Sequence, residues 1–225
     1  MRKYGFLKHS LVDYPGEVCS VVFMAGCNFH CPYCHNANLA TTIESEGWAL
    51  NEIVDYLVEA KSLITAVCIS GGEPTLYPET LNFLVNIFKK LGFKVKVDTN
   101  GSHPEQIQSL NALVDYFAMD LKTSLARYSE VCKGDICNQV EQSIQLLLKR
   151  NPSAYEFRTT LAWEFVNEEV ITDLGKRLSK DTAWYLQRCR YNPPLSTSEL
   201  TQETERIQKL LTLAKQYTDR VFFRE

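Results

Sequence analysis

Short apolar runs alternate along this chain with longer stretches of helical periodicity, and this alternation limits the fold more than any other feature. The apolar runs have strand length and lie at residues 19–24, 66–70, 93–98, 116–120, 155–159, 184–187 and 221–223. The helical patterns lie between them, at residues 49–62, 78–91, 104–113, 138–150, 168–179 and 199–217. Such alternation implies parallel strands joined by right-handed crossovers. The sequence therefore predicts an α/β fold, a partial (open) (β/α)6 barrel that forms a single domain over residues 1–225.

Polar or glycine-rich segments follow the predicted strands one after another. They are Gly26 and Cys27 after the first strand, Gly71, Gly72 and Glu73 after the second, Asp98, Thr99 and Asn100 at the third, Asp120 and Lys122 at the fourth, Arg158 in the fifth and residues 187–190 at the sixth. In parallel α/β barrels, catalytic groups gather at the carboxyl ends of the strands. A purely structural protein has no reason to repeat this placement, so the pattern predicts an enzyme.

Composition and charge exclude several other classes of protein. The formal net charge of the 225-residue chain is −3, which does not favour nucleic acid or an anionic membrane surface as a partner. No apolar run approaches the roughly 20 residues of a membrane-spanning helix. The first residues lack the apolar segment of a signal peptide. We therefore expect a cytoplasmic protein.

Three of the eight cysteines are clustered, and clustered cysteines in a cytoplasmic protein indicate metal binding or catalysis rather than disulfides. Cys27, Cys31 and Cys34 have the spacing CxxxCxxC on a predicted loop. Three local thiolates would hold a [4Fe–4S] cluster and leave its fourth iron open to a substrate.

Zinc is the alternative for this motif, because His30 or His35 would complete a tetrahedral site. The spacing disfavours it, since structural zinc sites use two pairs of ligands. The remaining cysteines are best interpreted as small buried apolar side chains; they are Cys19, Cys68, Cys132, Cys137 and Cys189.

The cysteine motif, with the aromatic Tyr33 before its last thiol, resembles the signature of the radical S-adenosylmethionine (SAM) superfamily. Gly71-Gly72-Glu73-Pro74 resembles the second motif of that superfamily. The resemblance implies that the open iron chelates the amine and carboxylate of SAM. One electron then splits SAM into methionine and a 5′-deoxyadenosyl radical. In this setting the two glycines would let backbone carbonyls approach the ammonium, and Glu73 would add negative charge beside it.

Within the superfamily, the chain resembles the activating enzymes of glycyl-radical enzymes, and more narrowly those of anaerobic ribonucleoside-triphosphate reductase. The matching segments are Cys34-His35-Asn36, Asp98-Thr99-Asn100-Gly101, Asp120-Leu121-Lys122 and residues 5–16. The resemblance covers nearly the whole chain. It implies that the partner is the large subunit of the reductase and that a flavodoxin or a ferredoxin-type protein supplies the electron. Residues 187–194 depart from the family pattern, which leaves the adenosine contacts of the sixth strand open.

The resemblance also implies roles for individual side chains. In pyruvate formate-lyase activating enzyme a monovalent cation lies beside the SAM carboxylate, which suggests Asp98, Thr99 and Asp120 as its ligands here; strand-end caps are the alternative. Lys122 would pair with the SAM carboxylate; an ordinary surface lysine is the alternative. Arg158 would contact SAM or the partner's backbone, or else form an ion pair with Glu73 or Asp120.

Four further residues complete the set of expected roles. Tyr33 and Asn100 are expected to contact the cofactor. His35 and Asn36 are interpreted as residues that shape the cysteine loop and tune the cluster.

A basic stretch is interpreted as a solvated face, with a flavodoxin contact as the alternative; it consists of Lys89, Lys90, Lys94 and Lys96.

Two rival functions remain open from the sequence. The first is a radical SAM enzyme that acts on a small molecule, such as 7-carboxy-7-deazaguanine synthase. The opening segment and Asp120-Leu121-Lys122 disfavour it. The second is an iron–sulfur electron-transfer protein without SAM chemistry, whose cluster spectrum would not respond to SAM.

Overall fold

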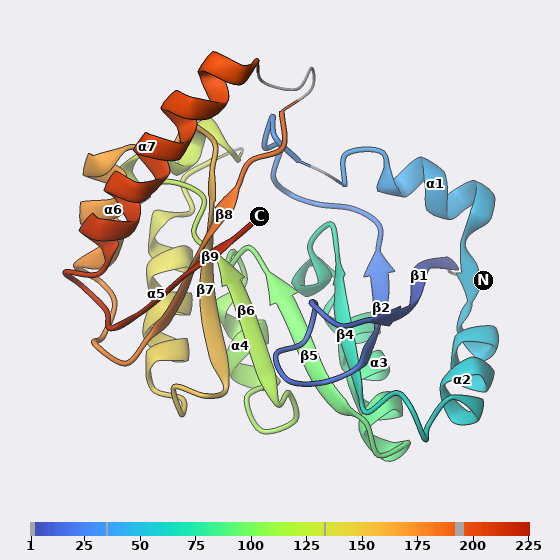
Figure 1. Cartoon of the computed structure of the whole chain (residues 1–225). Helices are drawn as coiled ribbons and strands as arrows, with labels where there is room; N and C mark the ends of the chain where they lie inside the picture. Colours follow the sequence, from blue (N-terminus) through green and yellow to red (C-terminus); the bar gives the residue numbers. More distant parts are fainter. Residues whose placement is uncertain (1–2, 35, 133, 192–195) are drawn as a thin grey trace. The chain divides into compact units, whose positions relative to one another are not determined.

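The computed structural model describes residues 3–34, 36–132, 134–191 and 196–225 (Figure 1). Within these ranges the strands form a sheet in the order β3-β1-β2-β4-β5-β6-β7-β8-β9. The strands are β1 (Lys3–Ser10), β2 (Cys19–Met24), β3 (Trp48–Ala49), β4 (Ala66–Gly71), β5 (Lys94–Thr99), β6 (Tyr116–Asp120), β7 (Tyr155–Leu161), β8 (Ala183–Arg188) and β9 (Arg220–Arg224). The helices are α1 (Leu39–Glu46), α2 (Leu50–Glu59), α3 (Pro78–Lys90), α4 (Pro104–Ser109), α5 (Cys137–Leu148), α6 (Glu168–Gly175) and α7 (Thr197–Ala214), with 3-10 turns η1 (Pro74–Leu76) and η2 (Leu125–Glu130).

Contacts divide the chain into two compact units. Unit 1 comprises Met1–Asn28, Cys34–Thr99 and His103–Ala118. Unit 2 comprises Phe29–Tyr33, Asn100–Ser102 and Met119–Glu225. The strands and helices predicted from the sequence are all present, and the mostly parallel, open sheet confirms the predicted fold class. That residues 1–225 act as a single domain stays a prediction.

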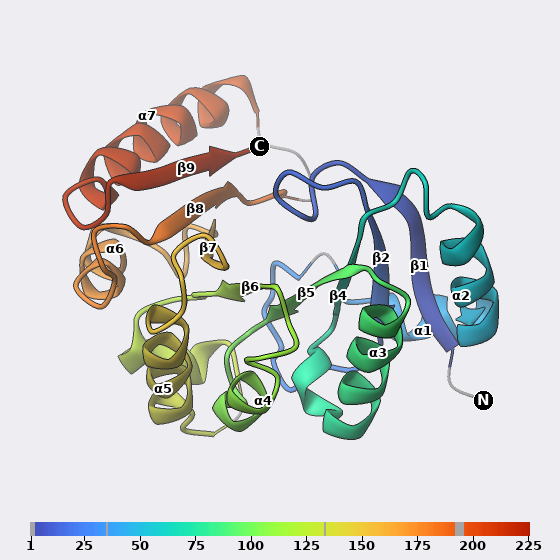
Figure 2. The ribbon, with the colours of Figure 1, turned by 90° about the horizontal axis from the view of Figure 1, so that it is seen from below.

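The centre of unit 1 is a parallel sheet that is buried on both faces. β2 pairs with β4 from Cys19↔Ala66 to Met24↔Gly71, and β4 pairs with β5 from Ala66↔Lys94 to Ile69↔Val97. β2 and β4 are almost continuously apolar, as expected for parallel strands covered on both sides, whereas β5 alternates lysines with valines before Asp98 and Thr99. α3 packs against β5 (Figure 2). The buried residues of α3 have helical spacing, and they are Leu81, Leu84, Val85 and Phe88.

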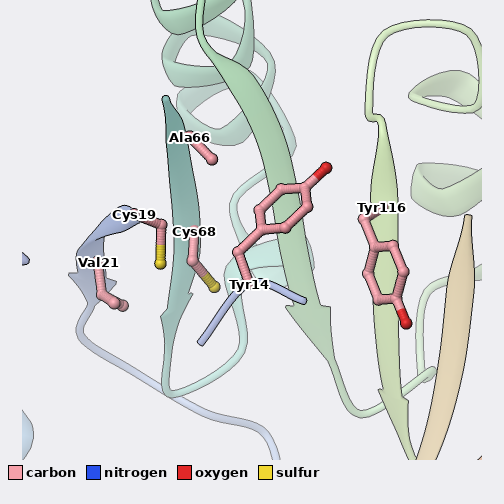
Figure 3. Close-up of a cluster of buried hydrophobic side chains, with 6 residues drawn as sticks. All are labelled: Tyr14, Cys19, Val21, Ala66, Cys68 and Tyr116. Carbon is pink, nitrogen blue, oxygen red and sulfur yellow. The ribbon is translucent and has the colours of Figure 1, made fainter. Parts of the chain in front are cut away.

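A loop residue closes over one face of this sheet. Tyr14 is buried against β4 and β6, with its ring centroid 5.7 Å from that of Tyr116 (Figure 3). The preceding turn holds Tyr14 in place, because the Ser10 hydroxyl donates to the Asp13 carboxylate at 2.6 Å. Burial raises the pKa of the Tyr14 hydroxyl above its ordinary value, and it raises the pKa of the neighbouring Cys19 thiol to about 11. Both groups therefore stay neutral in this cluster, which also contains Val21, Ala66 and Cys68.

Three elements of unit 1 were not expected from the sequence: β1, β3 and α1. β1 pairs antiparallel with β2, from Gly5↔Phe23 to Ser10↔Cys19, and antiparallel with β3. Its residues are mostly exposed or half-buried, and they show neither the apolar run of a central strand nor a regular alternation. Among the residues of α1 whose burial is described, Ile43 alone is buried, so this helix shows little of the apolar periodicity that predicts a helix.

Unit 2 contains the parallel strands β7, β8 and β9 and the helices α5, α6 and α7. β7 pairs with β8 from Phe157↔Trp184 to Leu161↔Arg188, and β8 with β9 from Ala183↔Arg220 to Gln187↔Arg224. The buried Trp184 indole donates to the Thr159 hydroxyl at 3.0 Å, so its only polar group is satisfied inside the core. Figure 2 shows α7 running alongside β9. Across the described ranges, no helix is long and apolar enough to span a bilayer.

Candidate active site

The Gly71-Gly72-Glu73 turn of unit 1 packs directly against the start of the cysteine loop. The Gly72 amide donates to the Met24 carbonyl and the Glu73 amide to the Gly26 carbonyl, each at 2.8 Å. A Cβ added at Gly72 would lie 2.0 Å from the Gly26 carbonyl oxygen. Gly72 is therefore required because two backbone segments touch here. This is a different reason from the approach to a ligand ammonium that the motif alone suggested.

A side chain of the cysteine loop completes this contact. The Asn36 amide donates to the Gly71 carbonyl at 2.9 Å, so the segment after Cys34 is tied to the end of β4. This agrees with the interpretation of Asn36 as a residue that shapes the loop. His35, which was given the same role, lies outside the described residues.

Glu73 is a buried carboxylate, with 1% of its surface exposed. Its Oε1 atom accepts hydrogen bonds from the Thr75 amide at 3.1 Å, from the Thr75 hydroxyl and from the Thr99 hydroxyl at 2.8 Å. Burying a charge is unfavourable unless hydrogen bonds replace water, and these donors do so. They also link the end of β4 to the end of β5.

Asp98 is the second acidic group at this edge, and it pairs with a lysine of its own strand. The Lys96 ammonium lies 2.6 Å from Oδ1 of Asp98, and the Ser70 hydroxyl donates to Oδ2 at 2.8 Å. Lys96 is 1% exposed, so the interpretation of it as part of a solvated face is wrong. Lys94, two residues earlier on the same strand, is exposed and pairs with Glu17.

A second cluster of charged side chains lies in unit 2, around Asp120. The Lys122 ammonium lies 2.8 Å from one carboxylate oxygen, and Nε of Arg158 lies 2.7 Å from the other. The Arg158 contact is the ion pair that the sequence offered as an alternative to a SAM contact. Burial would lower the pKa of Lys122, but the Asp120 carboxylate, followed by Tyr33 and Cys31, raises it above its ordinary value. The cluster thus carries two cations on one carboxylate.

Tyr33 lies beside this charged cluster. Its ring centroid is 5.6 Å from that of Phe165, and its buried hydroxyl has no hydrogen-bond partner among the described residues. Burial raises the pKa of this hydroxyl above its ordinary value, although Lys122 acts in the opposite direction. A buried hydroxyl without a hydrogen-bond partner is unfavourable in a folded protein, and a polar group bound beside it would remove this cost.

Asn100 has a local role. Its side-chain carbonyl accepts a hydrogen bond from the Ser102 amide at 3.0 Å, which closes the turn after β5. The Ser143 hydroxyl donates to the Gly101 carbonyl at 2.7 Å and anchors the same turn to α5. These contacts explain Asn100 as a turn residue, and its expected contact with the cofactor stays a prediction.

The cysteines of the motif lie on the loop after β2. Cys27 and Cys34 are exposed and belong to unit 1, whereas Cys31 is half-buried and belongs to unit 2. None of the eight cysteines, all of which lie in the described ranges, is in a disulfide. The described residues contain no group of three or more Cys, His, Asp or Glu side chains at metal-binding distance from one another. The ligand set therefore rests on the donor chemistry of three thiols on one short loop.

Comparison with known proteins identifies the family of this chain, which the geometry of the site does not. Residues 21–163 match the family model of the radical SAM superfamily. A protein of Methanocaldococcus jannaschii with the provisional name glycyl-radical enzyme activating enzyme is 35% identical over 98% of this chain and 94% of its own length. The chain belongs to the radical SAM superfamily.

Other relatives match shorter parts of this radical SAM enzyme. 7-Carboxy-7-deazaguanine synthase of Thermococcus kodakarensis is 28% identical over 60% of each chain. Pyruvate formate-lyase-activating enzyme of Clostridium pasteurianum is 30% identical over 50% of this chain and 48% of its own. The solved structure of TYW1 with a lysine-pyruvate adduct has a TM-score of 0.61 at 19% identity and covers 89% of this chain and 74% of that one. This last likeness supports the fold alone.

Radical SAM enzymes use a [4Fe–4S] cluster and SAM, and the residues of this chain fit both groups. Cys27, Cys31 and Cys34 lie within the segment that matches the family model, and thiolates are the ligands that such clusters require. The Tyr33 hydroxyl is buried without a partner among the described residues, so a polar group of a bound molecule would satisfy it.

The contacts do not support the expected site for a monovalent cation. Asp98 is bound by Lys96 and Ser70, and the Thr99 hydroxyl donates to Glu73. In unit 2 the Asp120 carboxylate is taken by Lys122 and Arg158. Each of the three expected ligands already has protein partners, and for both aspartates these partners include a cation.

Not all of the five other cysteines are buried as the sequence suggested. Cys19, Cys68, Cys132 and Cys189 are buried, whereas Cys137 is half-buried at the start of α5. Its thiol donates to the Leu125 carbonyl at 2.8 Å, so the position is polar rather than apolar.

Sequence reasoning missed Ser70 and the true position of Lys96. A signal for Lys96 was present, because Lys96 and Asp98 are two residues apart in one strand and so share a face. The role of Ser70 depends on the pairing of β4 with β5, which the sequence does not specify.

Proposed function

We propose that this radical SAM enzyme activates a glycyl-radical enzyme, and that its partner is the large subunit of an anaerobic ribonucleoside-triphosphate reductase. The similarity to the Methanocaldococcus jannaschii protein carries the first part, because it extends over nearly the full length of both chains. The deazaguanine synthase similarity covers only 60% of each chain. The choice of partner rests on residues 5–16 and on the segments at Cys34, Asp98 and Asp120, which resemble that group of activating enzymes.

When bound, the cluster and SAM supply a 5′-deoxyadenosyl radical after transfer of one electron from a flavodoxin or a ferredoxin-type protein. A hydrogen atom then moves from the glycine Cα of the partner to the 5′ carbon. One C–H bond breaks and one forms, and methionine and 5′-deoxyadenosine are the products. The unpaired electron stays on the glycine. A cytoplasmic location is part of this proposal, since a reducing compartment keeps the cysteine thiols available.

The chain's own residues have two tasks in this reaction. In unit 1, the Gly72 and Asn36 contacts fix the glycine turn against the cysteine loop, and this would help a cluster held by the loop and SAM bound beside the turn to meet in one geometry. In unit 2, Lys122 and Arg158 both pair with the carboxylate of Asp120, and these two cationic side chains would favour an anionic group such as the SAM carboxylate beside them. Positioning of this kind matters because a misplacement of about 1 Å lowers the rate of a reaction roughly 100-fold.

Three candidate substrates distinguish the proposal from its rivals. The anaerobically reconstituted enzyme is incubated with SAM and a low-potential reductant, together with the reductase large subunit, pyruvate formate-lyase or a pterin precursor of deazaguanine. We expect a glycyl radical signal in electron paramagnetic resonance with the reductase subunit and no consumption of the pterin. A signal on pyruvate formate-lyase alone would keep the activating function and change the partner. Catalytic consumption of the pterin would instead support the deazaguanine reaction.

A further inference from the structure

Lys96 is among the largest fully buried side chains of unit 1, and it is charged. Its ammonium lies 2.6 Å from Oδ1 of Asp98 and 3.9 Å from the sulfur of Cys68. Cys68 belongs to the buried cluster that also contains Tyr14. A buried ion pair is weak evidence for stability, because well-packed apolar residues of similar volume often serve as well or better. A lysine that is fully buried in the middle of β5 therefore needs another reason.

Two pairs of side chains link the ends of β4 and β5. Ser70 donates to Asp98, and Thr99 donates to Glu73. The turn between Ser70 and Glu73 contains the two glycines that pack against the cysteine loop. The position of this turn therefore depends on two buried carboxylates that accept these hydrogen bonds.

The two carboxylates are satisfied in different ways. Glu73 accepts bonds from two hydroxyls and one amide, and these are neutral donors. Asp98 instead contacts a full positive charge that is attached to its own strand two residues away. A dissociable cation beside Asp98 would have to displace the Lys96 ammonium or be repelled by it.

We propose that Lys96 acts as a permanent internal cation for Asp98, so that SAM binding by this chain does not depend on a dissociable monovalent cation. Lys96 is a positioning residue that acts through Asp98 and Ser70 on the glycine turn. The inference rests on membership of the radical SAM superfamily and not on the identity of the partner. Either claim can therefore fail without the other.

The first test uses the unaltered protein. The affinity of the reconstituted enzyme for SAM is measured by calorimetry in potassium, sodium or tetramethylammonium chloride at one ionic strength. Tetramethylammonium is too large to enter a cation site lined by carboxylates. We expect dissociation constants within twofold of one another. A tenfold or greater loss of affinity in tetramethylammonium would overturn the proposal.

The second test removes the cation. Lys96→Ala leaves Asp98 uncompensated beside a cavity, and we expect SAM affinity in tetramethylammonium to fall at least tenfold. Ammonium or methylammonium should restore most of it, because either ion fits where the lysine head group was. Lys94→Ala is the matched control, since Lys94 lies on the same strand and its side chain is 57% exposed. The control should bind SAM like the unaltered enzyme in every salt.

A readout that does not need the cluster guards against a variant that loses SAM binding through misfolding. The melting temperature of cluster-free Lys96→Ala should rise when ammonium replaces tetramethylammonium, and that of the unaltered protein should not. A Lys96→Ala protein that lost SAM affinity and melting temperature equally in all salts would show a purely structural lysine and overturn the proposal. SAM affinity equal to that of Lys94→Ala would overturn it as well.

Discussion

Replacing Cys31 by alanine is expected to abolish both cluster assembly and SAM cleavage. A [4Fe–4S] cluster held by only three thiolates has no spare ligand, so the loss of one leaves it poorly bound. Iron and sulfide should fall from about four of each per chain to near background after anaerobic reconstitution. Cys27→Ala and Cys34→Ala should behave in the same way.

Cys132→Ala and Cys137→Ala are the demanding controls for this prediction. Cys132 forms an isolated bridge with Phe29 of the cysteine loop, so it lies close to the motif without belonging to it. Both variants should keep their iron and their production of 5′-deoxyadenosine. If either lost iron as completely as Cys31→Ala, the assignment of three cluster ligands would be wrong.

Gly72→Val is expected to damage SAM binding and the cluster together. The added Cβ would lie 2.0 Å from the Gly26 carbonyl oxygen, and this oxygen is backbone that leads directly into Cys27. Relief of such a clash requires one of two backbone segments to move. We expect the free energy of unfolding to fall by about 3 kcal/mol, at the upper end of the range for overpacking. Denaturant unfolding measures the loss of stability, and iron counts after reconstitution measure the loss of the cluster.

Gly16→Ala serves as the control for Gly72→Val. Gly16 has a φ of +77°, so alanine is strained there, but a Cβ at this position meets nothing within 4 Å. This variant should lose about 1 kcal/mol of stability and keep a full complement of iron. A Gly72→Val protein that assembled the cluster normally would show that the turn does not position the cysteine loop.

The sequence predicted the parallel strands because each is a short apolar run bounded by polar segments, and parallel packing on both faces produces that pattern. It did not predict β1, which is mostly exposed or half-buried at the antiparallel side of the sheet. Here the pairing with β2 determines the structure, and no residue pattern in Lys3–Ser10 records that pairing.

The candidate site, like the fold, was only partly predictable from the sequence. The positions of Asp98 and Asp120 at strand ends were readable from the sequence, but of the cations that pair with them only Arg158 was considered, as one alternative for Asp120. Lys96 and Lys122 each lie two residues from their aspartate. In β5 this spacing places Lys96 and Asp98 on one face of the strand, whereas Lys122 follows the end of β6 at Asp120. Arg158 reaches Asp120 from a different strand, so its role depended on the order of strands in the sheet.

Hydrogen transfer from a labelled partner tests the central claim most directly. The reductase large subunit is prepared with glycine deuterated at Cα and incubated anaerobically with the reconstituted enzyme, SAM and a low-potential reductant. We predict that 5′-deoxyadenosine gains deuterium. The glycyl radical doublet seen with the unlabelled partner should also collapse to near a singlet. Efficient formation of 5′-deoxyadenosine without deuterium, and with no radical on the partner, would contradict the account.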